Sequence, residues 1–391
     1  MNINYLPKKI IFSVLGLFLF VACQNTKSRP TSTEIIKDTL KSVHQFKSID
    51  KNASRLKTYF EKLAHKSGFS GAVLIGQDGK TVYKDAFGFA NLQNKSLLTT
   101  ATPFQLASVS KQFTSASIML LKEKGLLNYE DSVQKFFPDF PYHGISIRLL
   151  LEHRSGLPNY IYFCDSYVKD KVKPINNAFA ISLMKVVKPP VYFPPDRRFD
   201  YSNTGYMILA SIVEKVSGVP FASFLHSNIF KPLGMNDTYL ATEDDQRKQR
   251  SASGYSRGRR SVGTTFLDGV IGDKGIYSSV EDLFKWDQAL YDGKLLKDQT
   301  LNEAFEPKGK KAEARENYGY GWRMFYWGDV KVIYHAGWWE GFQSLLIRIP
   351  EDRITIAVLK NRLVSSAPAK DSILKSLYPL TKKINQSASK R

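Results

Sequence analysis

The chain has 391 residues, of which 43% are hydrophobic, 13% aromatic and 24% charged. This composition excludes a disordered or collagen-like chain, and a body of this size buries enough surface to fold without disulfides or a structural metal. Lysine and arginine number 56 against 36 acidic residues, and the net charge of +20 favours anionic surroundings such as nucleic acid, an acidic membrane face or an anionic polymer.

The N-terminus has the pattern of an export signal. Lys8 and Lys9 precede an apolar run over residues 10–22, which is too short to cross a hydrocarbon core about 30 Å thick. The run ends at Phe20-Val21-Ala22-Cys23, an ending that resembles a bacterial lipoprotein signal. The alternative, a buried N-terminal helix, is disfavoured because residues 24–33 are polar and contain proline.

The lipoprotein resemblance implies cleavage before Cys23 and a lipid on that cysteine. We therefore predict an export signal over residues 1–22, a polar tether over residues 23–47 and a lipid anchor that holds the protein to a membrane of the bacterial cell envelope. Export argues against nucleic acid as a partner and leaves anionic lipid or an anionic envelope polymer to match the positive charge. The basic loop 247–260 is interpreted as a solvated segment or as a contact with such a polymer.

The expected elements of the body follow in chain order. The sequence predicts a helix that ends near His65, a hairpin with its turn at Asp78-Gly79, and amphipathic helices over 108–124 and 204–217. Apolar or β-branched runs then predict three strands, over 330–334, 344–349 and 354–359. A closing helix is expected over 372–378 and a frayed basic tail over 381–391. Strands near both ends of the chain predict one sheet built from both termini, with a helical lobe between them.

One Ser-x-x-Lys tetrad stands out by its context. The chain holds eight such tetrads, so the pattern alone carries no weight. Ser108-Val109-Ser110-Lys111, however, opens an amphipathic helix, where backbone N–H groups are unpaired and the helix dipole favours negative charge. Lys111 lies one turn later on the same face, within reach of the Ser108 hydroxyl, and a serine nucleophile needs such a neighbour.

Two further motifs occur once each. Tyr201-Ser202-Asn203 is the single Tyr-x-Asn among 20 tyrosines, and Asn203 is expected to cap the helix that follows. His335-Ala336-Gly337 is the single His-x-Gly among six histidines and follows the predicted strand 330–334. Lys66-Ser67-Gly68 is a decoy for this third motif, since it precedes Ser108 and no strand leads into it.

In this order, the three motifs resemble those of the serine β-lactamase and penicillin-binding superfamily, in its class C β-lactamase-like branch. That branch includes D-alanyl-D-alanine carboxypeptidases, D-aminopeptidases and esterases. The stretch from Leu149 to Pro158 and the stretch that begins at Gly275-Ile276-Tyr277-Ser278-Ser279 resemble two further family segments, and the resemblance covers roughly Phe69 to Asn361.

The resemblance implies an α/β (α+β) fold of the β-lactamase/transpeptidase type. We expect an antiparallel sheet flanked by helices, a mainly helical lobe, and an active site in the cleft between them. The catalytic domain is predicted as residues 48–380, with a sheet lobe over 48–105 and 270–380 and a helical lobe over 106–269. Residues 381–391 form the basic tail.

The resemblance also assigns catalytic roles. Ser108 would be the acylated nucleophile, Lys111 its proton acceptor or hydrogen-bond partner, and Tyr201 a proton relay between nucleophile and leaving group. Asn203 would orient the lysine or the substrate amide, and His335 can donate a hydrogen bond to Tyr201.

The implied oxyanion hole consists of the backbone N–H groups of Ser108 and Trp338, next to Gly337, and the loss of such a donor typically costs about 3 kcal/mol. Many lactamases carry lysine at the third motif, and the histidine found here is a weaker fixed cation for a substrate carboxylate, which argues mildly against efficient lactam hydrolysis. The pair Trp338-Trp339 follows where smaller residues are common and is expected to narrow the pocket or to give it an aromatic wall.

The leading hypothesis is an exported serine hydrolase that acts through an acyl-enzyme, without a cofactor or metal, on an amide, D-peptide, β-lactam or ester bond. Its partner would be a small-molecule or peptide substrate. The alternative is a catalytically silent envelope-binding protein that keeps the scaffold. An α/β-hydrolase and a zinc hydrolase are disfavoured: the single Gly-x-Ser-x-Gly, at residues 254–258, falls in the basic loop 247–260, and the sequence contains no His-Glu-x-x-His.

Overall fold

The computed structural model describes residues 53–241, 246–308, 317–363 and 370–378. The predicted signal, tether and basic tail lie outside these residues, and the predicted domain boundaries stay predictions. Within the described residues, no single helix is long and apolar enough to cross a membrane, although the bent pair Asn203–Ser217 and Phe221–Phe230 meets the length and composition criteria together.

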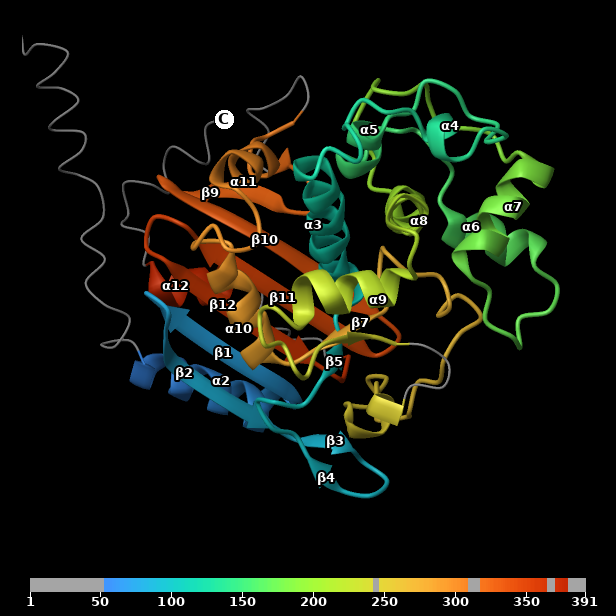
Figure 1. The fold of residues 1–391 in the computed structure, drawn as a ribbon. Helices are drawn as coiled ribbons and strands as arrows, with labels where there is room; N and C mark the ends of the chain where they lie inside the picture. Colours follow the sequence, from blue (N-terminus) through green and yellow to red (C-terminus); the bar gives the residue numbers. More distant parts are fainter. Residues whose placement is uncertain (1–52, 242–245, 309–316, 364–369, 379–391) are drawn as a thin grey trace, which may run out of the picture. The chain divides into compact units, whose positions relative to one another are not determined.

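A seven-stranded antiparallel sheet forms the centre of the fold (Figure 1). The first strand, β1 (Gly71–Gln77), lies between the second, β2 (Lys80–Phe87), and the last, β12 (Ile354–Lys360), and runs antiparallel to both. The sheet is thus built from both ends of the described chain, as predicted. In spatial order the strands are β2 (Lys80–Phe87), β1 (Gly71–Gln77), β12 (Ile354–Lys360), β11 (Phe342–Ile349), β10 (Val330–Trp339), β9 (Arg323–Trp327) and β8 (Asn317–Tyr318).

Strand β10 is longer than the sequence predicts. The strand was expected to end at Tyr334, but its pairing with β11 continues to Trp339, opposite Phe342. The two strands join through Glu340 and Gly341, which both have positive φ and make a tight turn possible. The His335 motif therefore lies inside a regular strand, where side chains alternate between the two faces of the sheet.

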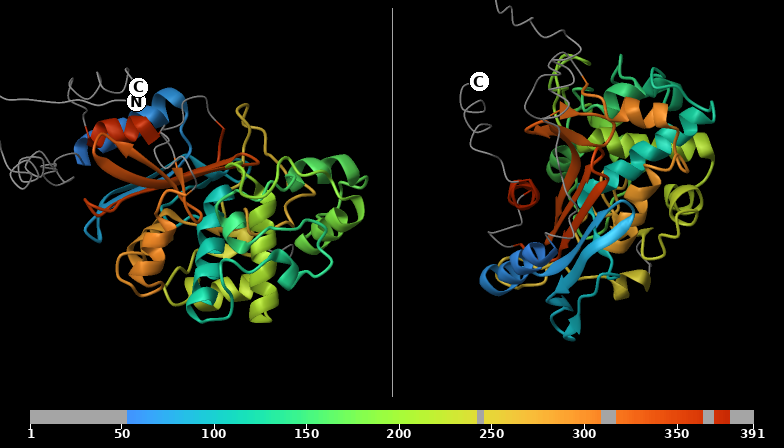
Figure 2. Two further views of the ribbon diagram at one scale, coloured as in Figure 1. Left: turned by 90° about the horizontal axis from the view of Figure 1, so that it is seen from above. Right: turned by 90° about the vertical axis from the view of Figure 1, so that its left-hand side faces the viewer.

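Helices cover both faces of the sheet (Figure 2). On one face, α2 (Ala53–Ser67) and α12 (Lys370–Leu377) bury Phe60 and Leu374 in one apolar cluster with sheet residues such as Ile356. We call this the outer face. The inner face packs on the helical body through α3 (Ser110–Glu123), α10 (Val280–Ala289) and the 3-10 turn η2 (Ala107–Val109).

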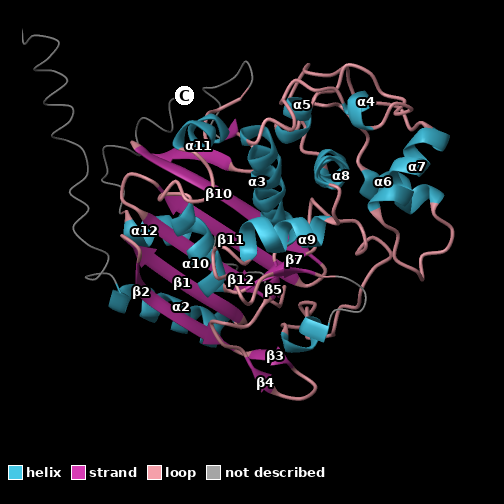
Figure 3. Cartoon of the chain, viewed as in Figure 1, coloured by secondary structure: helices cyan, strands magenta, loops and turns pink. Residues whose placement is uncertain are grey.

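The helical lobe lies on the inner side of the sheet (Figure 3). Its long helix α8 (Asn203–Ser217) runs next to α3, α5 (Ile147–Leu151) and α7 (Asn177–Val187). The interior of the lobe belongs to the larger of the two apolar clusters. This arrangement confirms the predicted fold class. The remaining elements are α4 (Val133–Phe136), α5 (Ile147–Leu151), α6 (Tyr160–Tyr167), α7 (Asn177–Val187), α8 (Asn203–Ser217), α9 (Phe221–Leu225), η3 (His226–Phe230), η4 (Gln246–Arg250), α11 (Asp298–Ala304), β3 (Phe89–Asn91), β4 (Ser96–Leu97), β5 (Phe104–Gln105), β6 (Tyr239–Leu240) and β7 (Ile276–Ser278).

Candidate active site

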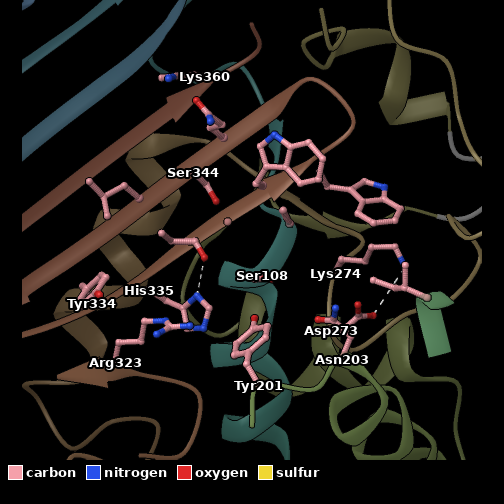
Figure 4. Close-up of a pocket in the computed structure, with 18 of the residues that line it drawn as sticks. Ser108, Tyr201, Asn203, Asp273, Lys274, Arg323, Tyr334, His335, Ser344 and Lys360 are labelled. Carbon is pink, nitrogen blue, oxygen red and sulfur yellow. Dashed lines mark hydrogen bonds and ion pairs between the residues drawn. The ribbon is translucent and has the colours of Figure 1, made fainter. Parts of the chain in front are cut away.

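A cavity of about 810 Å³ is lined by residues of the sheet and of the helical lobe (Figure 4). The three predicted motifs, which lie far apart in the sequence, all contribute residues to its lining. η2 supplies Ser108, the segment before α8 supplies Tyr201, and β10 supplies His335. The remaining sequence-predicted residues in the lining are Asn203, Gly337 and Trp338.

Lys111 lies beneath this cavity and is fully buried. Its Nζ donates hydrogen bonds to Ser108 Oγ at 3.1 Å, to Asn203 Oδ1 at 2.8 Å and to the carbonyl oxygen of Asp273 at 3.0 Å. An ammonium group has three protons, so these acceptors satisfy it completely. The predicted reach from Lys111 to Ser108 is observed, because η2 runs directly into the first turn of α3.

The Tyr201 motif sits at the start of α8, one residue out of the expected register. Asn203 was expected to be the N-cap, but Ser202 has that position and Asn203 is the first helical residue. The Asn203 side chain is thereby free to accept the hydrogen bond from Lys111. Tyr201 lies just before the cap, with its ring centroid 4.9 Å from Lys111 Nζ.

His153 holds this segment in place. Its Nδ1 accepts a hydrogen bond from the Ser202 backbone N–H at 3.1 Å, and its ring lies 4.3 Å from the Tyr201 ring, centroid to centroid. Because Nδ1 is the acceptor, His153 is neutral. Burial, together with the nearby Lys111 charge, lowers its pKa well below the ordinary value of 6.5. The sequence predicted a structural histidine here, and these contacts agree with that interpretation.

His335 bonds to Tyr318 rather than to Tyr201. Its Nε2 lies 3.1 Å from the Tyr318 hydroxyl, and its Nδ1 lies 2.8 Å from the Ala336 carbonyl oxygen, a bond drawn in Figure 4. The ring centroids of His335 and Tyr201 are 6.2 Å apart. Burial and the Lys111 charge lower the pKa of His335 well below 6.5, so the ring is neutral and supplies no fixed cation.

Gly337 lets β10 approach the Ser108 turn closely. A Cβ atom at this position would lie 2.9 Å from the Ser108 backbone nitrogen and still closer to the Leu106 carbonyl oxygen. Ser344, opposite Gly337 on β11, donates a hydrogen bond to the same carbonyl at 2.5 Å. The strand and the turn are thus joined at the place where the predicted oxyanion donors lie.

The two tryptophans after Gly337 have different environments. Trp338 is 59% exposed, whereas Trp339 is buried and donates from Nε1 to Asp268 at 2.6 Å. Both line the cavity, so the predicted aromatic wall is present on two sides of β10.

Sequence reasoning missed a second buried lysine in the cavity wall. Lys274 donates to the Tyr160 hydroxyl at 2.6 Å and to the Val270 carbonyl at 2.9 Å, and its ammonium lies 3.8 Å from the Asp273 carboxylate. Burial lowers the pKa of Lys274, and Asp273 opposes this effect. The pair directly precedes the family-like stretch that begins at Gly275, and that position was the signal that was overlooked. Among the described residues, no group of three or more His, Cys, Asp and Glu side chains is placed to hold a metal ion.

Comparison with known proteins identifies the family of this chain. The family model described as "Beta-lactamase" matches residues 56–377. The chain belongs to the β-lactamase family.

The family member "Penicillin-binding protein 4*" of Bacillus subtilis is 37% identical over 323 residues, which cover 78% of this chain and 71% of that protein. A D-aminopeptidase of Cereibacter sphaeroides is 26% identical over 310 residues, which cover 78% of this chain and 59% of the relative. The crystal structure of a penicillin-binding protein from Bacillus halodurans superposes with a TM-score of 0.72 at 25% identity, covering 82% of this chain and 99% of that one.

Replacing Gly337 tests the close approach of β10 to the Ser108 turn. Gly337→Ala is expected to lower kcat/KM for an ester substrate about 100-fold, because the added methyl displaces the Ser108 backbone N–H, and one oxyanion donor is worth about 3 kcal/mol. Gly263→Ala is the control, since a Cβ there meets nothing within 4 Å. Wild-type turnover in Gly337→Ala, with an unchanged melting temperature, would contradict this account.

The two neutral histidines predict a loss of stability in mild acid. His153 and His335 have folded-state pKa values below 6.5. As the pH falls below 6.5, the unfolded chain therefore binds more protons than the folded chain. The free energy of unfolding should decrease by up to about 1.4 kcal/mol per pH unit for each histidine and be fully restored above pH 6.5. Urea unfolding between pH 7.5 and 5.5 measures the slope. His335→Gln should reduce this slope by the contribution of one proton, about 1.4 kcal/mol per pH unit. The exposed His65→Gln should leave the slope unchanged.

Proposed function

We propose that this protein is an exported serine hydrolase that forms an acyl-enzyme on Ser108. The observation that carries the proposal is the hydrogen bond from the buried Lys111 ammonium to Ser108 Oγ, at 3.1 Å, on the wall of the cavity. A hydroxyl is a weak nucleophile by itself, and a cation held against it stabilises the negative charge that develops on the oxygen during attack.

The reaction proceeds in two halves. Ser108 Oγ attacks the substrate carbonyl carbon, and Tyr201, as its phenolate, accepts the hydroxyl proton. When the C–N or C–O bond to the leaving group breaks, the leaving group takes that proton from Tyr201. Water then attacks the Ser108 ester and gives a proton to Tyr201, which returns it to Oγ as the acid product leaves. The bonds from Lys111 to Asn203 and to the Asp273 carbonyl oxygen hold its side chain beside Ser108 throughout.

The carbonyl oxygen of the substrate is held by the backbone N–H groups of Ser108 and Trp338. Gly337 keeps these two backbone segments in contact. The substrate bond is an amide, D-peptide, β-lactam or ester bond. The similarity to a penicillin-binding protein and to a D-aminopeptidase supports D-peptides and related amides first, and the neutral His335 disfavours efficient lactam hydrolysis because the third motif has no cation for the lactam carboxylate.

Replacing Ser108 tests the acyl-enzyme directly. Incubation with a fluorescent penicillin or a fluorophosphonate should add one adduct to the wild-type chain by intact mass and none to Ser108→Ala. Turnover of p-nitrophenyl esters should fall by at least about 10³-fold in that variant. Ser182→Ala is the matched control, because Ser182 and Lys185 form another Ser-x-x-Lys tetrad on the exposed side of α7. A folded wild-type protein that forms no adduct and turns over no ester would overturn the proposal and favour the silent envelope-binding alternative.

We also propose that residues 1–22 direct export and that Cys23 carries the lipid anchor; this proposal rests on the sequence alone. In cells fed a labelled fatty acid, the full-length chain should take up label and fractionate with membranes. Cys23→Ser should lose the label and leave the membrane fraction, whereas Cys164→Ser should behave as wild type because Cys164 is buried in the core. Equal labelling of the wild type and Cys23→Ser would refute the anchor.

A further inference from the structure

Lys360, the last residue of β12, is a buried lysine whose amine has no hydrogen-bond partner among the described residues. Only 3% of its surface is exposed. Burial lowers its pKa to about 8. A buried ammonium is costly unless it is paired, so Lys360 is suited to an anionic group that comes from outside the described residues.

Strand register places Lys360 in a row with two other side chains of the outer face. Trp338 on β10 is opposite Gln343 on β11, and Gln343 is opposite Lys360 on β12. Residues directly opposite each other in antiparallel strands point to the same face. A second row, two residues away, consists of Ala336, Leu345 and Val358.

These two rows belong to the same cavity as Ser108, since all six of their residues line it; Figure 4 labels Lys360 and Ser108. The cavity passes round the edge of β10. Strand β9 pairs with β10 only from Val330 to Tyr334, so among the described strands none covers that edge beside Ala336 and Trp338. A substrate bound at Ser108 on the inner face can therefore extend round this edge to the outer face.

The charges that line the cavity favour an anionic ligand. Its lining contains four cations and one carboxylate: Lys274, Arg323, Lys360, Lys370 and Asp273. Lys274 is held by Tyr160 and Asp273, Arg323 lies over the Tyr201 ring, and Lys370 lies over the Phe325 ring. No such contact holds Lys360 within the part of the chain that the structure describes. Next to it in the row, Gln343 Oε1 is also buried without a hydrogen-bond partner among the described residues.

We propose that the row Trp338–Gln343–Lys360 is a remote subsite for a peptide substrate that carries a carboxylate. The carboxylate accepts hydrogen bonds from Lys360, a peptide N–H donates to Gln343 Oε1, and the apolar part of the peptide lies on Trp338 and Leu345. This inference rests on the proposed function, because it assumes that the acyl group of the substrate is attached to Ser108 while its far end reaches Lys360.

The sheet geometry sets the length of this substrate. Two strand spacings of about 4.8 Å separate the Trp338 position from Lys360, so roughly three residues of extended peptide are needed to span the row. We expect a preference for a terminal carboxylate only in acyl chains that extend at least that far beyond the residue that lies at Trp338. Shorter acyl chains end near Trp338 and should show no preference.

The test uses p-nitrophenyl esters of oligoglycine chains of increasing length, capped with succinyl or with the uncharged methoxysuccinyl group. Glycine avoids a choice between L and D substrates. In the wild type, kcat/KM for the long succinyl ester should exceed that of its methoxysuccinyl partner about 10-fold or more, since a hydrogen bond to a charged group is worth that much. Lys360→Met should abolish the preference through KM and leave the uncharged ester within about 2-fold of wild type. Lys294→Met, an exposed control, should keep the preference.

The outcomes separate this inference from the proposed function. If Lys360→Met still turns over the uncharged ester and still prefers the long succinyl ester, the subsite is refuted while the hydrolase stands. If no ester is turned over, the hydrolase is refuted, and the subsite is tested by binding of a succinyl-oligoglycine amide to Ser108→Ala and to Ser108→Ala/Lys360→Met. Weaker binding in the double variant supports the subsite, and equal binding overturns it.

Discussion

The buried ammonium of Lys111 is the interaction on which the candidate site depends. A lysine fully removed from water is costly unless acceptors surround it, and here three acceptors do so: Ser108 Oγ, Asn203 Oδ1 and the Asp273 carbonyl oxygen. They come from three stretches that are far apart along the chain. Satisfying one charge therefore requires the turn before α3, the start of α8 and the segment before β7 to meet at one point. The same geometry places a hydroxyl against a cation at the wall of a cavity.

The Lys111 charge influences the protonation states of the ionisable groups around it. His153 and His335 both stay neutral because burial and the Lys111 charge oppose a second cation, and each is then able to accept a hydrogen bond that fixes its neighbours. Lys274 is also buried, but Tyr160 and Asp273 compensate its charge. Lys360 lacks such compensation among the described residues. This contrast is why we assign a structural role to Lys274 and propose a ligand-binding role for Lys360.

Much of the fold was predictable because local patterns agree with the tertiary structure. The apolar runs of the strands, the Asp78-Gly79 turn and the apolar faces of the two long helices are local patterns that burial and turn geometry impose directly on the sequence. The length of β10 was not predictable in this way. Its extension from Tyr334 to Trp339 depends on pairing with β11 and on a two-residue turn, and the motif His335-Ala336-Gly337 does not resemble an ordinary strand sequence. Asn203 was assigned one position too early for the same kind of reason, since its side chain bonds to a distant lysine instead of its own helix.

The sequence by itself determined the family-like motifs, the residues Ser108, Lys111, Tyr201 and His335 as candidates, and the expectation that they meet in a cleft. Only the tertiary structure decided how they are paired: His335 with Tyr318, His153 behind Tyr201, and Lys274 with Tyr160 and Asp273. It also decided that Lys360 shares a cavity with Ser108, through the register of three strands. The physical reason is that sequence patterns record burial and local hydrogen bonding, whereas the pairing of buried polar groups depends on which distant atoms the packing brings within about 3 Å.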